Sequence, residues 1–228
     1  MDREEVRQRL DDLVSRYRET VGRTASQPGL QERVRALASF QSRRLAATYA
    51  ELRATGRYRD AVDFFLADLY GPHDLSDRDE QVIRALDKLK RFLPAAALDA
   101  LVRAFELHVL TIELDAATAA QLTEERQPDA ISYAVAYRAA GHAEDRDRQI
   151  TLVDDIGRLL DSLAQRPEVG IAIRIARGPA HAAGYGQLQD FLERGYAAFK
   201  RMGGATEFLA VIERRERELM QRLLSGGH

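Results

Sequence analysis

Apolar residues recur along the chain at intervals of three and four, which is the spacing of one face of an α-helix. One run extends from Val6 to Val21, and a longer run extends from Val34 to Leu52. Gln27-Pro28-Gly29 separates the two runs and is typical of a turn. The pattern therefore predicts two long amphipathic helices, each burying one stripe.

Turn and capping residues mark further helices. Gly71-Pro72 ends a third helix that begins near Tyr58, and Ser76 with Asp79 has the spacing of a capping box that opens a fourth. Pro94 suits the first turn of a fifth. Later apolar runs predict helices over residues 129–141, 150–163 and 188–202 and at the carboxyl end, with no strand-like alternation. We predict an all-α, compact bundle of about nine to ten helices.

The polar stretch TEERQPD, residues 123–129, is the only boundary between two halves that this pattern indicates. A chain of 228 residues can form one large helical domain or two small ones that share a core. We expect a single helical domain over residues 1–228, with two packed halves, 1–123 and 129–228, as the alternative organisation.

Composition narrows the classes of partner. The net charge of −2 provides no overall field to attract nucleic acid or an anionic membrane. The absence of cysteine excludes disulfides and thiolate metal sites. The charged amino terminus and the lack of a long apolar stretch predict a cytoplasmic protein with no membrane span. The nearest approach to a nucleic-acid face is an arginine series on the second helix, interpreted as solvated surface that pairs with other helices: Arg33, Arg35, Arg43, Arg44 and Arg53.

The segment FFLADLYGPHDLSDRD, residues 64–79, concentrates ionisable groups among apolar ones. Asp68 falls in the last turn of the third predicted helix, where the helix dipole disfavours a carboxylate. The simplest compensation is an ion pair with Arg78. The alternative is a cation site, with oxygen and imidazole ligands from Asp68, His73, Asp74, Asp77 and Asp79. No ligand spacing of a defined period is present, so we predict no metal.

This segment also resembles a motif of the form FFLxDLYG followed by an Arg-Asp pair. The motif is similar to that of an uncharacterised family of bacterial helical proteins, and the similarity extends over most of the chain. The resemblance implies an all-helical fold and no particular activity.

The helix FELHVLTIELD, residues 105–115, has apolar stripes on two faces and is therefore expected to be sandwiched. Glu106 and Glu113 fall on one flank, whereas His108 and Asp115 fall on the other. Glu106 and His108 therefore cannot bind one ion together, and the Glu-x-x-His spacing of ferritin-like di-iron proteins is absent. A heme oxygenase-like di-iron site, or heme held by His108 or His181, stays open as an alternative, and the cofactor is left unknown.

A second candidate site lies between Val169 and Gln189, where Arg174, Arg177 and His181 occur without an acid. Arg177-Gly178-Pro179 could open a helix whose free N–H groups hold a phosphate or carboxylate. The alternative is a close helix crossing that needs small residues. No P-loop, dinucleotide fingerprint or nucleophile elbow is present.

We expect a module that acts by binding: a protein partner, a second copy of itself, or a small anionic or apolar ligand. The alternative is an enzyme that uses carboxylate and imidazole groups. An enzyme would gather such groups in one polar pocket, whereas an interaction protein would expose an apolar patch. The candidate residues of the enzyme alternative are Asp68, His73, Asp74, Arg78, Glu106, His108 and Glu113.

Overall fold

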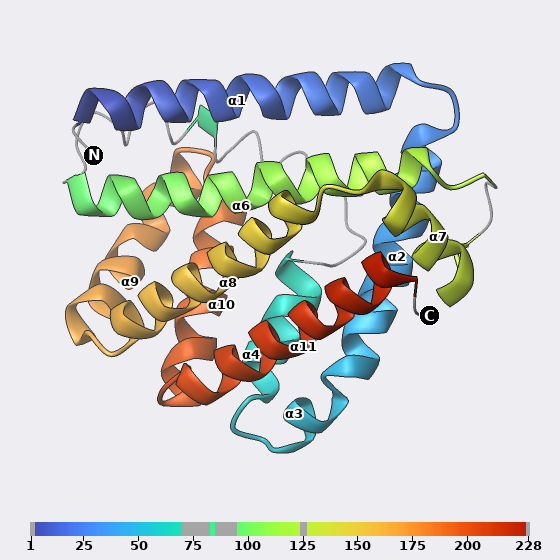
Figure 1. Cartoon of the computed structure of the whole chain (residues 1–228). Coiled ribbons are helices and arrows are strands. Elements are labelled where there is room, and N and C mark those ends of the chain that lie inside the picture. Colours follow the sequence, from blue (N-terminus) through green and yellow to red (C-terminus); the bar gives the residue numbers. More distant parts are fainter. Residues whose placement is uncertain (1–2, 70–82, 85–94, 124–126, 227–228) are drawn as a thin grey trace.

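The computed structural model describes residues 3–69, 83–84, 95–123 and 127–226. Within these ranges the chain forms ten α-helices and one π-helical turn and contains no strand, which confirms the predicted all-α bundle (Figure 1). The elements are α1 (Arg3–Ser26), α2 (Leu30–Thr48), α3 (Ala50–Ala54), α4 (Arg59–Phe64), η1 (Phe65–Leu69), α6 (Ala95–Ala120), α7 (Ala130–Ala140), α8 (Ala143–Ala164), α9 (Pro167–Ala182), α10 (Gly186–Met202) and α11 (Thr206–Ser225).

Helix α6 is the centre of the bundle, and α1 runs parallel to it (Figure 1). The two helices keep one register: Arg9 meets Glu106, and Arg16 meets Glu113 seven residues later. Seven residues are close to two helical turns, so both pairs fall on the same seam.

Both apolar faces of α6 are covered, as its two stripes predict. Val102, Phe105 and Val109 pack against the stripe of α1 that contains Leu10 and Leu13. On another face, Leu110 and Leu114 pack against Leu152 of α8. Helix α6 is therefore sandwiched between α1 and α8.

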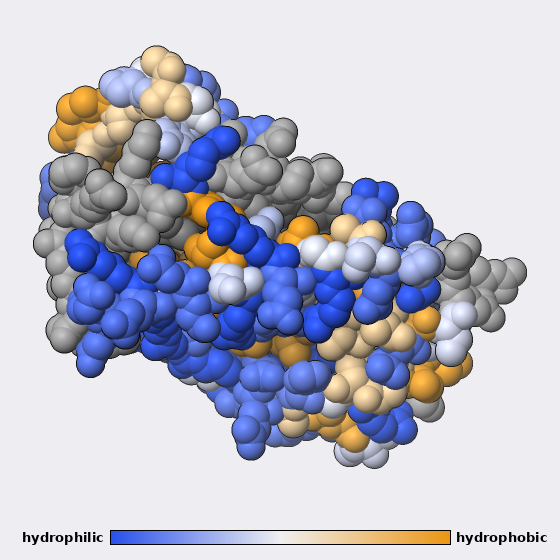
Figure 2. Space-filling view, turned by 90° about the horizontal axis from the view of Figure 1, so that it is seen from above, coloured by the Kyte–Doolittle hydropathy of each residue, from blue (hydrophilic) through white to orange (hydrophobic). Residues whose placement is uncertain are grey.

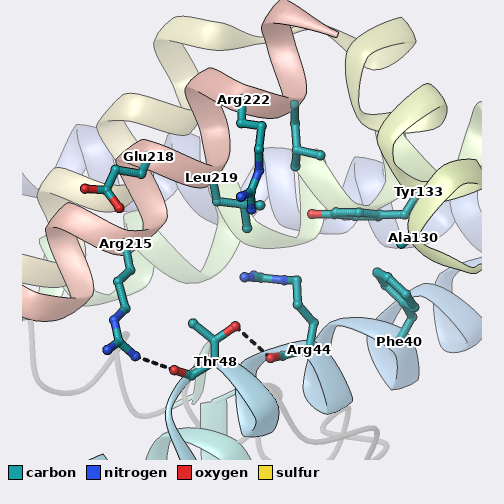
Figure 3. A pocket seen from close by; sticks show the side chains of 10 residues that line it. Phe40, Arg44, Thr48, Ala130, Tyr133, Arg215, Glu218, Leu219 and Arg222 are labelled. Carbon is teal, nitrogen blue, oxygen red and sulfur yellow. Dashed lines mark hydrogen bonds between the residues drawn. The ribbon is translucent and has the colours of Figure 1, made fainter. Parts of the chain in front are cut away.

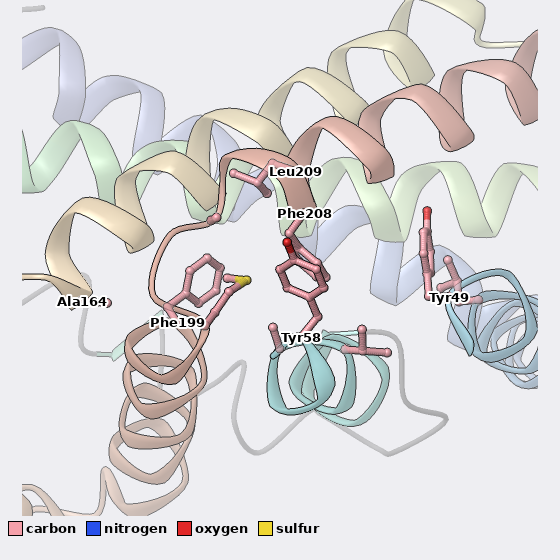
Figure 4. Close-up of a cluster of buried hydrophobic side chains, with 11 residues drawn as sticks. Tyr49, Tyr58, Ala164, Phe199, Phe208 and Leu209 are labelled. Atoms are coloured by element: carbon pink, nitrogen blue, oxygen red, sulfur yellow. The ribbon is translucent and has the colours of Figure 1, made fainter. Parts of the chain in front are cut away.

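The largest apolar cluster lies where α2, α4, α10 and α11 meet (Figure 4). Phe199 and Phe208 are almost wholly buried there, and Tyr58 packs on the Phe208 ring with centroids 5.5 Å apart. Leu45 and Val62 belong to the same cluster. Residues from both sides of the polar stretch at 123–129 thus share one core.

Two helices differ from the prediction in their interior. The long second helix is interrupted at Tyr49, between α2 and α3, where the side chain is buried and its hydroxyl donates to Glu216. The third helix continues past Phe64 as the π-helical turn η1. The apolar spacing did not show either change, because it persists through both.

The exposed face of α1 is polar, and Figure 2 shows its hydrophilic side chains as a blue band across the molecule. Several apolar side chains remain exposed elsewhere, among them Ile131 on α7 and Ile175 on α9. No helix in the described ranges is both long and apolar enough to cross a membrane.

Candidate functional site

The acidic corner predicted around Asp68 falls mostly outside the described residues. Asp68 lies on η1, and nothing is described of its side chain. His73, Asp74 and Arg78 lie outside the described ranges. The ion pair of Asp68 with Arg78, and the enzyme site at this corner, therefore stay predictions.

The two glutamates of α6 are held by arginines. Glu106 accepts from Arg9 of α1 at 2.7 Å and from Arg148 of α8 at 3.1 Å. Glu113 accepts two hydrogen bonds from Arg16, at 3.0 and 2.6 Å. Such ion pairs fix the register of neighbouring helices and occupy the lone pairs that a ligand would need.

His108 does not join these glutamates in a metal site. Its ring lies against Tyr17 of α1, with centroids 5.8 Å apart. Among the described residues, no group of three His, Asp or Glu side chains could hold a metal ion.

The basic residues of α9 are spread along an exposed helix. Arg177 donates to Glu193 at 2.7 Å, and His181 contacts Asp190 at 3.2 Å, both acids being on α10. Arg174 is exposed. Pro179 lies inside α9 and does not open a helix, because the helix begins twelve residues earlier at Pro167. The predicted helix start at Arg177-Gly178-Pro179 is therefore wrong, and anion binding by Arg174, Arg177 and His181 stays a prediction.

The polar groups that do converge lie between α2, α6, α7, α8 and α11. They line a cavity of about 60 Å³, which we call the inner cavity. Its polar and ionisable lining residues are Gln41, Arg44, Asp115, Tyr133, Tyr137, Arg146, Gln149 and Glu216.

Asp115 is the carboxylate deep in this group. Gln41 donates to its Oδ1 at 2.7 Å, and no arginine of the described residues donates to it directly. Burial raises the pKa of Asp115 to about 6, although Gln41, Arg146 and Arg44 each oppose that rise. Asp115 can therefore change its charge near neutral pH.

Arg146 approaches the inner cavity from α8 and is itself buried. Its Nε donates to the Gly141 carbonyl and its Nη2 to the Thr118 hydroxyl, both at 2.9 Å. The guanidinium stacks on Tyr137, 3.5 Å from the ring centroid. All of these partners are neutral, and the charge of Arg146 favours the ionised form of Asp115, which lines the same cavity.

Arg44 extends from α2 toward α11. It forms a two-pronged ion pair with Glu216, whose carboxylate also accepts from the Tyr49 hydroxyl. Desolvation lowers the pKa of Arg44, but Glu216, Tyr133 and Tyr49 together raise it by more, so the net shift is upward and the guanidinium stays charged. Its buried Nε has no acceptor within the described part of the chain.

A larger space, the outer cleft, adjoins this group and measures about 330 Å³. It is lined by Phe40, Arg44, Thr48, Ala130, Tyr133, Arg215, Glu218, Leu219, Arg222 and Leu223 (Figure 3). The volume falls at the lower end of the range for small-molecule sites.

The ends of three side chains point into the outer cleft: the guanidiniums of Arg44 and Arg222 and the hydroxyl of Tyr133 (Figure 3). Burial raises the pKa of Tyr133, so the hydroxyl keeps its proton and can donate it in a hydrogen bond. At the rim of the cleft, Arg215 donates to the Thr48 carbonyl and to Glu51. Glu218 points away from Arg44 and Arg222 (Figure 3).

The sequence contained one signal for this site that the prediction missed. Arg44 was assigned to a solvated arginine series, yet it lies seven residues after Leu37 and four after Phe40, on the buried stripe of α2. Its pairing with Glu216 of another helix agrees with part of that interpretation. Nothing in the spacing of Tyr133 and Arg222 places them opposite Arg44, because their contact depends on how α7 and α11 pack.

Comparison with known proteins identifies the family and no activity. Residues 21–228 match the model of a family described as a domain of unknown function, DUF8198, in agreement with the resemblance to an uncharacterised family. No curated protein and no solved structure matches the chain. Since the family model covers almost the whole sequence, the chain belongs to the DUF8198 family.

Proposed function

We propose that this protein binds a small anionic ligand in the outer cleft between α2, α7 and α11. One observation supports the proposal most: two guanidiniums and a hydroxyl, from three different helices, point into one space of ligand size. Like charges repel, and an anion between Arg44 and Arg222 would turn that repulsion into two charge-assisted hydrogen bonds.

The lining also indicates the kind of anion. Phe40, Leu219 and Leu223 supply apolar walls beside the arginines. Binding sites of this type bury an apolar body and fix its orientation through a few polar groups. A carboxylate carried on a small aromatic or aliphatic body suits both halves of the cleft.

Arg222 is the residue whose replacement tests the proposal most cleanly. It is exposed and makes no ion pair with any residue that the structure describes, so Arg222→Gln leaves no buried acid without a partner. Arg44→Gln, by contrast, would leave the Glu216 carboxylate without its arginine partner. Arg214, exposed on the same helix and outside the cleft lining, provides the matched control Arg214→Gln.

The experiment is isothermal titration calorimetry with benzoate and with its neutral analogue benzamide. We expect benzoate to bind more tightly than benzamide, Arg222→Gln to weaken benzoate binding roughly tenfold, and Arg214→Gln to leave it unchanged. Equal affinity for the two probes, or an equal loss in both variants, would contradict the proposal.

A further inference from the structure

The outer cleft and the inner cavity share a wall. Arg44, Tyr133 and Leu219 line both spaces. The inner cavity has room for roughly two water molecules, and polar groups surround it. A charge placed in the outer cleft therefore lies one side chain away from the groups around Asp115.

The polar groups that share the inner cavity with Asp115 come from every other helix around it. Helix α2 contributes Gln41 and Arg44, α7 contributes Tyr133 and Tyr137, α8 contributes Arg146 and Gln149, and α11 contributes Glu216. Helix α1 contacts a different flank of α6, where Arg16 binds Glu113.

The charges of this group are balanced only while Asp115 is ionised. Arg44 is paired with Glu216, and Arg146 binds neutral acceptors, so two guanidiniums stand against two carboxylates. An anionic ligand between Arg44 and Arg222 would bring a third negative charge, and Arg222 balances it in the outer cleft. Arg222 does not line the inner cavity, whereas Arg44 lines both spaces, so the ligand weakens the positive field of Arg44 at Asp115. The carboxylate best able to lose its charge is Asp115, because it has no guanidinium donor among the described residues.

We infer that an anion entering the outer cleft binds together with a proton, which Asp115 takes up from solvent. This inference rests on the proposed function and specifies how the same site is regulated. The proton goes to Oδ2 of Asp115, while Gln41 continues to donate to Oδ1. No bond other than this O–H bond forms or breaks in the protein.

Two physical arguments support the coupling. A like charge nearby disfavours ionisation of a carboxyl group, and Arg44 is the shared cation whose field the ligand would partly neutralise. Because Asp115 already titrates near pH 6, a modest added repulsion is enough to protonate it at neutral pH. By linkage, a protonated Asp115 must strengthen ligand binding by the same factor.

The test uses benzoate as the probe, because carboxylic acids ionise near pH 4 and its charge is constant above about pH 5.5. Isothermal titration calorimetry at pH 5.5 and pH 7.5, in two buffers with different ionisation enthalpies at each pH, gives the affinity and the number of protons taken up. The proteins are wild type, Asp115→Asn and, as a control acid exposed on α1, Asp12→Asn.

We expect wild type to bind benzoate roughly tenfold more tightly at pH 5.5 than at pH 7.5 and to take up a proton on binding at pH 7.5. Asp12→Asn should behave like wild type. Asp115→Asn carries a permanently neutral side chain and should bind with high affinity at both pH values, without proton uptake.

The outcomes separate this inference from the proposed function. Benzoate that binds wild type with no pH dependence and no proton uptake would overturn the coupling and leave the binding site standing. The same pH dependence in Asp115→Asn would also overturn it, because the proton would then reside elsewhere. No binding to wild type at either pH would overturn the proposed function itself. If Asp115→Asn does not fold, proton uptake by wild type alone still decides the question.

Discussion

Replacement of Asp115 by asparagine should stabilise the fold at neutral pH. The buried carboxyl has a pKa of about 6 in the folded protein, against 3.8 as its ordinary value. Above pH 6 the native state must keep a charge that burial disfavours, whereas the unfolded chain solvates that charge freely. Asparagine has the same shape and no charge, and its carbonyl can still accept from Gln41.

The magnitude follows from proton linkage. An acid whose pKa is raised on folding binds protons more tightly in the native state, so the free energy of unfolding falls as pH rises from about 4 to 6 and is level above that. A difference of two pKa units corresponds to about 3 kcal/mol. We expect the free energy of unfolding of Asp115→Asn to exceed that of wild type by about 3 kcal/mol at pH 7.5, by about half of that at pH 5, and by little at pH 4.

Urea unfolding followed by circular dichroism at these three pH values measures the effect, with Asp12→Asn as the control. The quantity of interest is the difference in free energy of unfolding between variant and wild type, followed as a function of pH. The contributions of other titrating groups cancel in this difference. A variant that is less stable than wild type by the same amount at every pH would refute the reasoning. It would mean that Arg44 and Arg146 stabilise the Asp115 carboxylate more than burial destabilises it.

Other substitutions test the packing, each by urea unfolding. Phe208→Ala should cost about 3–5 kcal/mol, because the ring is almost fully buried in the largest cluster; a loss below about 1 kcal/mol would contradict that placement. Gly22→Ala, in open space on α1, should raise the free energy of unfolding by up to about 1 kcal/mol. Gly157→Ala should lower it, because the new methyl group would meet the buried Leu209. Equal effects of the two substitutions would be inconsistent with this close approach. Asp129→Ala should lose about 1 kcal/mol, because it removes the capping box of α7; an unchanged stability would exclude a role for that cap.

Helical periodicity was sufficient to predict the fold class, because each helix buries a stripe that sequence spacing reveals. The stripes of α1 and α6 correspond to the observed cluster of Leu10, Leu13, Phe105 and Val109. Interruptions within helices were not predictable in this way. At Tyr49, where α2 ends and α3 follows, the hydroxyl donates to Glu216 of α11, and apolar spacing carries no information about such a partner.

The site was harder to predict, because its residues come from helices far apart in sequence. Arg44 and Glu216 are separated by 172 residues, and only the tertiary fold brings their side chains together. Sequence reasoning favoured local clusters such as Arg174, Arg177 and His181, whose charges sit on an exposed helix surface. It placed Asp115 on a flank of α6 and could not show that this flank faces a polar cavity.

The central claim is that an anion binds between Arg44 and Arg222, and a structure with a heavy-atom probe tests it most directly. Crystals soaked with 4-iodobenzoate would reveal the iodine by its anomalous scattering. We predict the carboxylate within hydrogen-bonding distance of both guanidiniums and the iodinated ring against Phe40 and Leu219. Occupancy elsewhere on the surface, with the cleft between α2, α7 and α11 empty at saturating probe, would contradict the account.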